Sequence, residues 1–288
     1  MQKIFSYIRL KSSLAFDRLF NQKKLNQRAE ILAEMQPVIV LGRGKSGTRL
    51  LPWCLEHLGV AMSIKPGVVA GDVDDSVFRK IVKQLARRCL FVDRPEDVSN
   101  EDLELFQIVV LRLWEKMSKN PNRANAWGWK YPETYLIAPL VYRCFPNARF
   151  IHIIRDGRDV AFRQHLTDDP TTPLGYDILA SLNALDKPQH IRAALSWKFQ
   201  VEKYAKFTNQ IPRENHFELT YEEFSSDSVE TFKRVAGFLK IEMTSECAEF
   251  VRAWVKSGHV NQYLSEGEEK IEEVEGLLLS TLQRFKYV

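Results

Sequence analysis

The chain has 288 residues, 45% of them hydrophobic, so it is long enough to bury the core of one large domain. Its formal net charge is +4. Residues 1–36 carry all of that excess, and no nucleic-acid motif accompanies it, so we expect no nucleic-acid partner. The four cysteines are scattered without a C-x-x-C pair, which indicates buried thiols in a reducing compartment and no metal site.

Residues 1–36 are predicted to form a basic amphipathic arm in front of a single α/β domain that covers residues 37–288. Arg9 and Lys11 interrupt any apolar run long enough for a signal peptide or a membrane span. We therefore expect a cytoplasmic protein. The arm either packs on the domain as a helix or lies on the inner membrane face as an interfacial helix, and both alternatives remain open.

Residues 37–51 join a short apolar strand to a helix through a loop rich in glycine and positive charge. The strand, residues 38–41, is apolar throughout, which is typical of a strand buried on both faces of a parallel sheet. The glycines that follow let the backbone approach a ligand closely, and the helix after the loop begins with N–H groups that favour an anion.

This loop has the G-x-x-x-x-G frame of a nucleoside-triphosphate loop from Gly42 to Gly47. A Walker-type loop then requires Lys followed by Ser or Thr, and Thr48 and Arg49 occupy those positions. The lysine lies inside the loop instead, at Lys45. The sequence therefore predicts a loop that binds a phosphate-like group without a metal.

Strands and helices alternate along the rest of the chain. Helices are expected over residues 77–91, 101–119, 133–145 and 190–207, and strands around 127–130, 150–154 and 216–219. This order predicts a helix-rich α/β fold with a central parallel sheet flanked by helices. Residues 167–188 contain three prolines and little periodicity, which marks them as a candidate lid.

Three segments in this order resemble the sulfotransferases that use 3′-phosphoadenosine 5′-phosphosulfate (PAPS). Residues 45–48, Lys-Ser-Gly-Thr, are similar to the family's 5′-phosphosulfate loop, and residues 150–161 are similar to its 3′-phosphate element, a strand that ends in arginine before a helix. Residues 219–224 are similar to a third landmark. The resemblance implies a three-layer sandwich related to P-loop kinases, PAPS as donor, 3′,5′-bisphosphoadenosine (PAP) as product, and no metal.

The resemblance also implies roles for particular residues. Lys45 would stabilise the leaving phosphate, and Lys130, in a K-x-P element, would lie near the sulfuryl group. Arg155 would bind the 3′-phosphate, or else pair with a neighbouring aspartate. Tyr221 would contact the adenine, or else belong to the core. The full predicted nucleotide site comprises Arg43, Gly44, Lys45, Ser46, Gly47, Thr48, Arg49, Arg155, Arg163 and Tyr221.

The sequence departs from the family pattern at Arg163, which stands where a serine usually assists Arg155. We expect Arg163 to face the 3′-phosphate; a helical ion pair with Asp159 is the alternative. Asp75 is the candidate general base, and its alternative role is the N-cap of the next helix. The R-K-G-x-x-G element of the cytosolic phenol and steroid enzymes is missing from the sequence.

We therefore expect sulfuryl transfer to a hydroxyl of a glycan, a glycolipid or a lipid head group. A P-loop-type kinase and a non-catalytic scaffold with the same fold are the alternatives.

Overall fold

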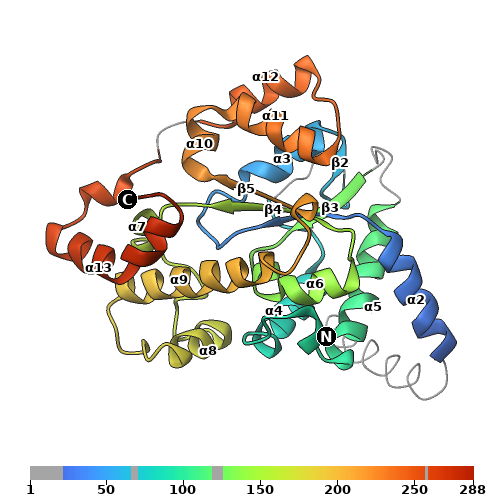
Figure 1. Ribbon diagram of the computed structural model, residues 1–288, viewed down its shortest axis with the longest axis horizontal. Helices are drawn as coiled ribbons and strands as arrows, with labels where there is room; N and C mark the ends of the chain where they lie inside the picture. The colour runs from blue at the N-terminus through green and yellow to red at the C-terminus, as the bar shows by residue number, and fades with distance from the viewer. Residues whose placement is uncertain (1–21, 66–70, 119–125, 257–258) are drawn as a thin grey trace.

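The computed structural model describes residues 22–65, 71–118, 126–256 and 259–288 (Figure 1). One parallel sheet of five strands forms its centre, in the order β2-β3-β1-β4-β5. The strands are β1 (Val38–Leu41), β2 (Val60–Ala61), β3 (Ala126–Lys130), β4 (Arg149–Ile154) and β5 (His216–Thr220). Helices cover both faces, so the predicted three-layer α/β fold is confirmed.

The helices form two layers and an end group. Below the sheet in Figure 1 lie α4 (Ser76–Arg88), α5 (Asn100–Met117), α6 (Ala138–Cys144), α8 (Pro173–Ser181) and α9 (Gln189–Thr208). Above it lie α3 (Leu50–His57), α10 (Tyr221–Ser226), α11 (Ser228–Leu239) and α12 (Ser245–Trp254). At one end, α7 (Gly157–Ala161) and α13 (Glu268–Arg284) pack against α9. Short 3₁₀ segments are η1 (Pro95–Asp97), η2 (Pro132–Ile137), η3 (Arg213–Asn215) and η4 (Gln262–Ser265).

The burial of strand β1 on both faces explains why its sequence is a continuous apolar run. Ile39 and Leu41 belong to the larger core, which includes α4, α5 and α9, while Val38 and Val40 belong to the core beneath α3, α11 and α12. All four side chains are buried. A central parallel strand contributes to two cores at once, so neither face of it can be polar.

Two predicted segments differ in detail. Residues 133–145 form η2 and then α6 instead of one helix, and Pro139 stands in the first turn of α6, where its missing N–H costs nothing. The candidate lid contains a helix, α8, which Thr172 caps by accepting a hydrogen bond from Gly175 N–H. Trp127 and Trp129, an aromatic pair in β3, are buried in the larger core.

The N-terminal arm is described only from α2 (Gln22–Glu34) onward. Leu32 of this helix is fully buried, and α2 contacts α5 and α6. This portion of the arm therefore packs on the domain, while residues 1–21 lie outside the described residues. Within the described part of the chain, no helix is long and apolar enough to cross a membrane.

Candidate active site

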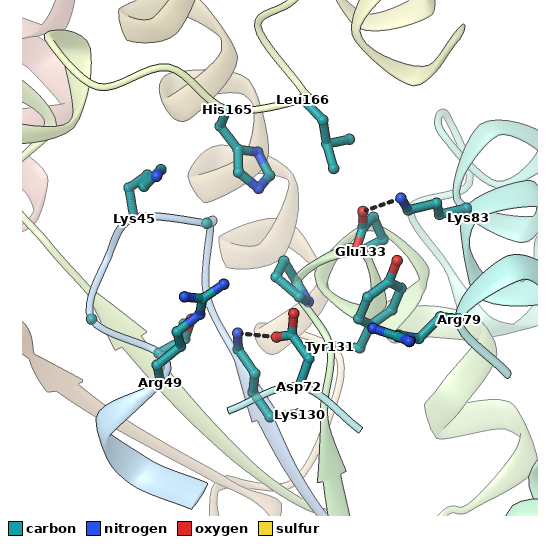
Figure 2. Close-up of a pocket in the computed structure, with 14 residues that line it drawn as sticks. Lys45, Arg49, Asp72, Arg79, Lys83, Lys130, Tyr131, Glu133, His165 and Leu166 are labelled. Carbon is teal, nitrogen blue, oxygen red and sulfur yellow. Dashed lines mark hydrogen bonds and ion pairs between the residues drawn. The ribbon is translucent and has the colours of Figure 1, made fainter. Parts of the chain in front are cut away.

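A cavity of about 390 Å³ lies at the carboxyl ends of β1 and β3 (Figure 2). This is the edge of an open parallel sheet at which ligands usually bind. The loop after β1, the end of β3, helix α4 and the segment after α7 all contribute to the lining. The lining residues are Gly44, Lys45, Gly47, Thr48, Arg49, Asp72, Arg79, Lys83, Lys130, Tyr131, Pro132, Glu133, His165 and Leu166.

The loop needs its glycines for close approach. A Cβ on Gly44 would lie 2.1 Å from His165 Nε2, and one on Gly47, whose φ is +81°, would lie 2.3 Å from the Tyr221 ring. Within the described part of the chain, the N–H groups of Gly47, Thr48 and Arg49 donate to no other residue. Three free N–H groups at the start of α3, next to Lys45, favour an anionic ligand, and the binding of a 5′-phosphate there stays a prediction.

Ser46 and Arg43 support this loop rather than line the cavity. Ser46 is buried, and its N–H donates to the Arg43 carbonyl at 3.1 Å. The Arg43 guanidinium is fully buried and forms an ion pair with Asp168, which holds the loop against the segment after α7. The Arg43 guanidinium does not line the cavity, which speaks against direct contact between this side chain and the nucleotide.

Lys130 lies on the floor of the cavity, where its ammonium donates to Asp72 Oδ1 at 2.5 Å. Its side chain is only 3% exposed, and burial lowers the pKa of Lys130 while Asp72 opposes that shift. The lysine of the predicted K-x-P element is therefore a buried residue that lines the cavity. Asp72 fixes its direction, although the sequence analysis gave that aspartate no separate role.

Glu133 is a second acidic group that the sequence analysis missed. It follows Lys130 by three residues, and its carboxylate lies 3.8 Å from the Lys83 ammonium while its Oε2 atom is buried without a partner. Burial raises the pKa of the Glu133 carboxyl above its ordinary value, because desolvation outweighs the opposing effects of a backbone hydrogen bond, the Lys83 charge and the Tyr131 hydroxyl. A buried carboxylate with a free oxygen and a raised pKa is suited to accept a proton.

Asp75 has the structural role given as its alternative. Its Oδ1 accepts hydrogen bonds from the N–H groups of Val77 at 2.9 Å and Phe78 at 2.8 Å, which makes it the N-cap of α4, and its other oxygen pairs with Lys116. It does not line the cavity. This geometry speaks against the predicted role of Asp75 as general base.

The pKa of His165 reflects its burial and the positive charges around the cavity. Its pKa is lowered to about 2, first by burial and then by the positive charges of Arg43, Lys45, Lys130 and Lys83. The imidazole is therefore neutral at physiological pH. Burial is the larger cause of this shift, but the four cations that add to it also favour an anionic ligand in the cavity.

A second group of cations surrounds Tyr221 on the other side of the loop. The Arg155 guanidinium lies 4.3 Å from the centre of the Tyr221 ring and bonds to Asp159 Oδ2 at 2.8 Å, so its alternative role in an ion pair is realised. Arg163 is close enough for the charge of Arg155 to lower its pKa, although burial is the larger cause. It donates to Gln262 and forms no ion pair with Asp159.

Arg163 also lines a second cavity of about 780 Å³, together with Asp159 and residues 261–266. Tyr263 N–H donates to Asp159 Oδ1 at 3.0 Å, which ties the C-terminal segment to α7. No role was expected for this segment from the sequence. The Tyr221 ring contacts both Gly47 of the loop and Arg155, so one aromatic side chain joins the loop to this second group of cations.

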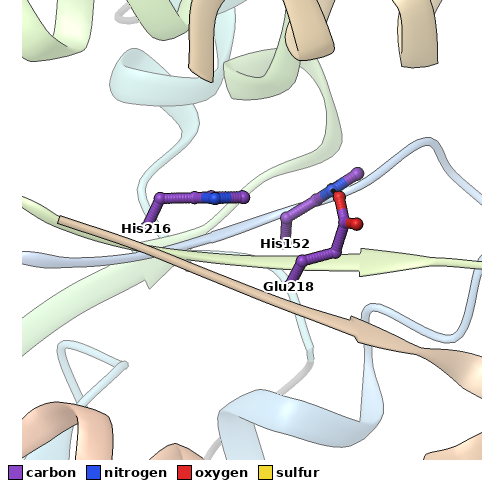
Figure 3. Close-up of side chains that lie close together, drawn as sticks. All are labelled: His152, His216 and Glu218. Atoms are coloured by element: carbon purple, nitrogen blue, oxygen red, sulfur yellow. Dashed lines mark hydrogen bonds and ion pairs between the residues drawn. The ribbon is translucent and has the colours of Figure 1, made fainter. Parts of the chain in front are cut away.

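One further cluster of ionisable groups lies at the edge of the sheet. His152, His216 and Glu218 project from β4 and β5 on the same face, with their candidate ligand atoms within 4.8 Å of one another (Figure 3). His152 bonds through Nδ1 to Glu218 at 2.8 Å and through Nε2 to the Tyr135 hydroxyl at 2.7 Å. Because both nitrogens have partners in the chain, we interpret the cluster as a hydrogen-bond network that joins the edge strand to the core.

A parallel sheet with a glycine-rich, cationic loop after its central strand defines a nucleotide-dependent group-transfer enzyme. Comparison with known protein families and solved structures specifies the class of group-transfer enzyme. The model of the sulfotransferase family matches residues 37–245, so the chain belongs to the sulfotransferase family. This result confirms the predicted enzyme class.

Solved structures agree in fold. Sulfotransferase STF9 from Mycobacterium avium is 14% identical, with a TM-score of 0.55 over 94% of this chain and 80% of that one. Mouse sulfotransferase SULT7A1, complexed with PAP, is also 14% identical, with a TM-score of 0.50 over 91% of this chain and 90% of that one. No curated protein matches the sequence.

Proposed function

We propose that the chain transfers the sulfuryl group of PAPS to a hydroxyl group of an acceptor. The observation that carries this proposal is the pair of cationic groups that adjoin Tyr221: the loop with Lys45, whose Gly47 contacts the Tyr221 ring, and Arg155, which stacks on that ring with Arg163 near it. A nucleotide with phosphate at both the 3′ and the 5′ position needs two anion sites.

The described residues fit such a donor. The free N–H groups of Gly47, Thr48 and Arg49 suit the 5′-phosphate. Arg163, which lines the second cavity, suits the 3′-phosphate, and the buried, ion-paired Arg155 adds its charge from behind. Tyr221 is only 4% exposed and belongs to the core beneath α3, α11 and α12, so its alternative role in the core is realised and its ring supports Gly47 and Arg155. When bound, PAPS supplies the activated sulfuryl group, and the PAP in the mouse sulfotransferase structure is the corresponding product.

Lys45 and Lys130 stabilise charge during the transfer. The bond from sulfur to the bridging oxygen breaks, its electron pair stays on the 5′-phosphate, and a new bond forms between sulfur and the acceptor oxygen. Lys45 neutralises the charge that develops on the leaving phosphate, while Asp72 holds the Lys130 ammonium toward the sulfuryl oxygens. The preorganised cations act in place of a divalent metal.

Glu133 accepts the proton of the acceptor hydroxyl. Its free, buried Oε2 atom and its raised pKa support this role, and it lies in the same cavity as Lys130. This assignment replaces Asp75. The acceptor is a hydroxyl of a glycan, a glycolipid or a lipid head group, since a polar and charged cavity suits a hydrated acceptor better than an apolar one.

Calorimetry with PAP, and separately with ATP and Mg²⁺, tests the proposal. We expect PAP to bind without a metal and ATP with Mg²⁺ to bind weakly. Tight binding of ATP with Mg²⁺ and none of PAP would favour the kinase alternative. A screen with ³⁵S-labelled PAPS over glycans and lipids then separates an enzyme, which labels an acceptor, from a scaffold, which binds PAP without turnover.

A further inference from the structure

Helix α4 brings two cations to the cavity that the sulfuryl donor does not require. Arg79 and Lys83 are four residues apart, so they lie on the same side of the helix. Figure 2 shows them across the cavity from Lys45 and Arg49 of the loop. The side of the cavity that faces away from the donor loop is therefore positively charged as well.

The charges of the lining residues are unequal. Five lysines and arginines line the cavity against two carboxylates, Asp72 and Glu133, which leaves three positive charges with His165 neutral. The phosphosulfate end of the donor brings two negative charges. One positive charge then remains, and a second appears whenever Glu133 takes up a proton.

Arg79 is the cation of the cavity lining whose positive charge is left unbalanced. Lys130 pairs with Asp72 and Lys83 lies 3.8 Å from Glu133. The Arg79 guanidinium, by contrast, has neither a hydrogen bond nor an ion pair among the described residues, and its charge acts only on the Tyr131 hydroxyl. Two turns further along the same helix, Arg87 does have such a partner, since its Nε donates to Asp177 at 2.5 Å. A partly buried guanidinium without a counterion, at the wall of a cavity, favours an anionic ligand.

We infer that the acceptor carries an anionic group, a carboxylate or a phosphate, beside the hydroxyl that receives the sulfuryl group, and that Arg79 and Lys83 bind this group. The inference rests on the proposed function. Arg79 bonds to two oxygens of the anion, and Lys83 turns from Glu133 to the same anion, which leaves the Glu133 carboxylate free to accept the hydroxyl proton. Charge recognition and proton transfer are thus coupled through Lys83.

The test uses acceptors in matched pairs, measured by calorimetry on the full chain saturated with PAP. One pair is a glucuronate-containing tetrasaccharide and its carboxyl-reduced, neutral form. The other is phosphatidylglycerol and monogalactosyl diacylglycerol in vesicles, so the two pairs separate a sugar carboxylate from a lipid phosphate. We expect the anionic member of one pair to bind about 10- to 100-fold more tightly than its neutral counterpart.

Variants then assign the preference to helix α4. Arg79→Ala should remove most of the anionic preference, and Arg79→Lys should keep part of it. Lys80→Ala is the matched control, because Lys80 is an exposed cation of the same helix that does not line the cavity. The Kd for PAP should change less in Arg79→Ala than the Kd for the anionic acceptor.

The outcomes separate the inference from the proposed function. If PAP does not bind the wild-type chain, the proposed function fails and the inference fails with it. If PAP binds but both members of each pair bind equally, or none binds, the inference alone is overturned. Equal weakening of neutral and anionic acceptors by Arg79→Ala would overturn it as well.

Discussion

Lys45 lies in a strained position that suits a catalytic cation. Its φ is +77°, a conformation that few non-glycine residues adopt, and the loop around it is fixed by Arg43 and Ser46. We predict that Lys45→Ala lowers kcat by about a hundredfold or more, the usual effect of removing one transition-state donor. The fold and Tm should be retained.

Steady-state kinetics with labelled PAPS and thermal unfolding measure both effects. Lys233→Ala, which removes an exposed lysine of α11, is the matched control. Near-wild-type turnover in Lys45→Ala would reassign Lys45 to a bystander role.

Glu133 replaces Asp75 as the proposed general base, and substitution of each carboxylate by its amide distinguishes the two residues. Glu133→Gln should lower kcat by about 10²- to 10⁴-fold, the range for loss of a general base. In the wild type, activity should fall as the pH drops through the raised pKa of Glu133, because the protonated carboxyl accepts no proton, and Glu133→Gln should lack this acidic limb.

The matched variant Asp75→Asn should keep the pH profile and lose about 1 kcal/mol of stability, because it breaks the pair with Lys116. A pH–rate profile and a denaturant titration measure these effects. An acidic limb that disappears in Asp75→Asn and persists in Glu133→Gln would restore Asp75 as the base.

At the scale of elements, the loop after β1 depends on the contact between Gly47 and Tyr221. We predict that Gly47→Ala weakens PAP binding by about tenfold or more, because the methyl group meets the Tyr221 ring and the backbone has φ of +81°. Gly237→Ala in α11 is the control: its Cβ would meet no atom within 4 Å, so this variant should gain about 0.5 to 1 kcal/mol of stability. Unchanged PAP affinity in Gly47→Ala by calorimetry would show that the loop tolerates displacement.

The edge strand β5 gives a prediction for stability against pH. Burial, followed by the charge of His152, lowers the pKa of His216 to about 4, while Glu218 opposes that shift. The unfolded chain, with an ordinary pKa near 6.5, therefore binds the proton first. The contribution of His216 to the free energy of unfolding is fully present above pH 6.5. As the pH falls from 6.5 to 4, this contribution decreases by about 1 to 3 kcal/mol. Urea titrations of the wild type and His216→Asn should show a smaller loss in the variant; parallel curves would refute this account.

Across the whole molecule, local patterns predicted the elements, and pairs distant in sequence escaped prediction. The strand β1, its loop and the end of β4 were predictable because apolar runs and turn residues lie within a few positions of one another. Arg43 reads like any loop cation until its partner, Asp168, is brought to it from 125 residues away. Asp72 and Lys130, which are 58 residues apart, raise the same difficulty. A nucleotide-binding arginine and a buried ion-paired arginine have the same local sequence.

Arg163 is the position where the N-terminal and C-terminal parts of the site meet. It extends from the end of α7 to Gln262, and it lies close to Arg155 beside the second cavity. Two neighbouring cations, of which only Arg155 is paired with an aspartate, repel each other, and a doubly charged phosphate bound between them would relieve that repulsion. We therefore predict that Arg163→Ala weakens the binding of PAP about tenfold and weakens the binding of adenosine 5′-phosphosulfate, which has no 3′-phosphate, much less.

Calorimetry with both nucleotides makes the comparison, and Lys233→Ala again serves as the control. If both nucleotides weaken equally, Arg163 acts only through its bond to Gln262. If PAP binds more tightly to the variant, the arginine obstructs the nucleotide, and the non-catalytic scaffold becomes the preferred account of this chain.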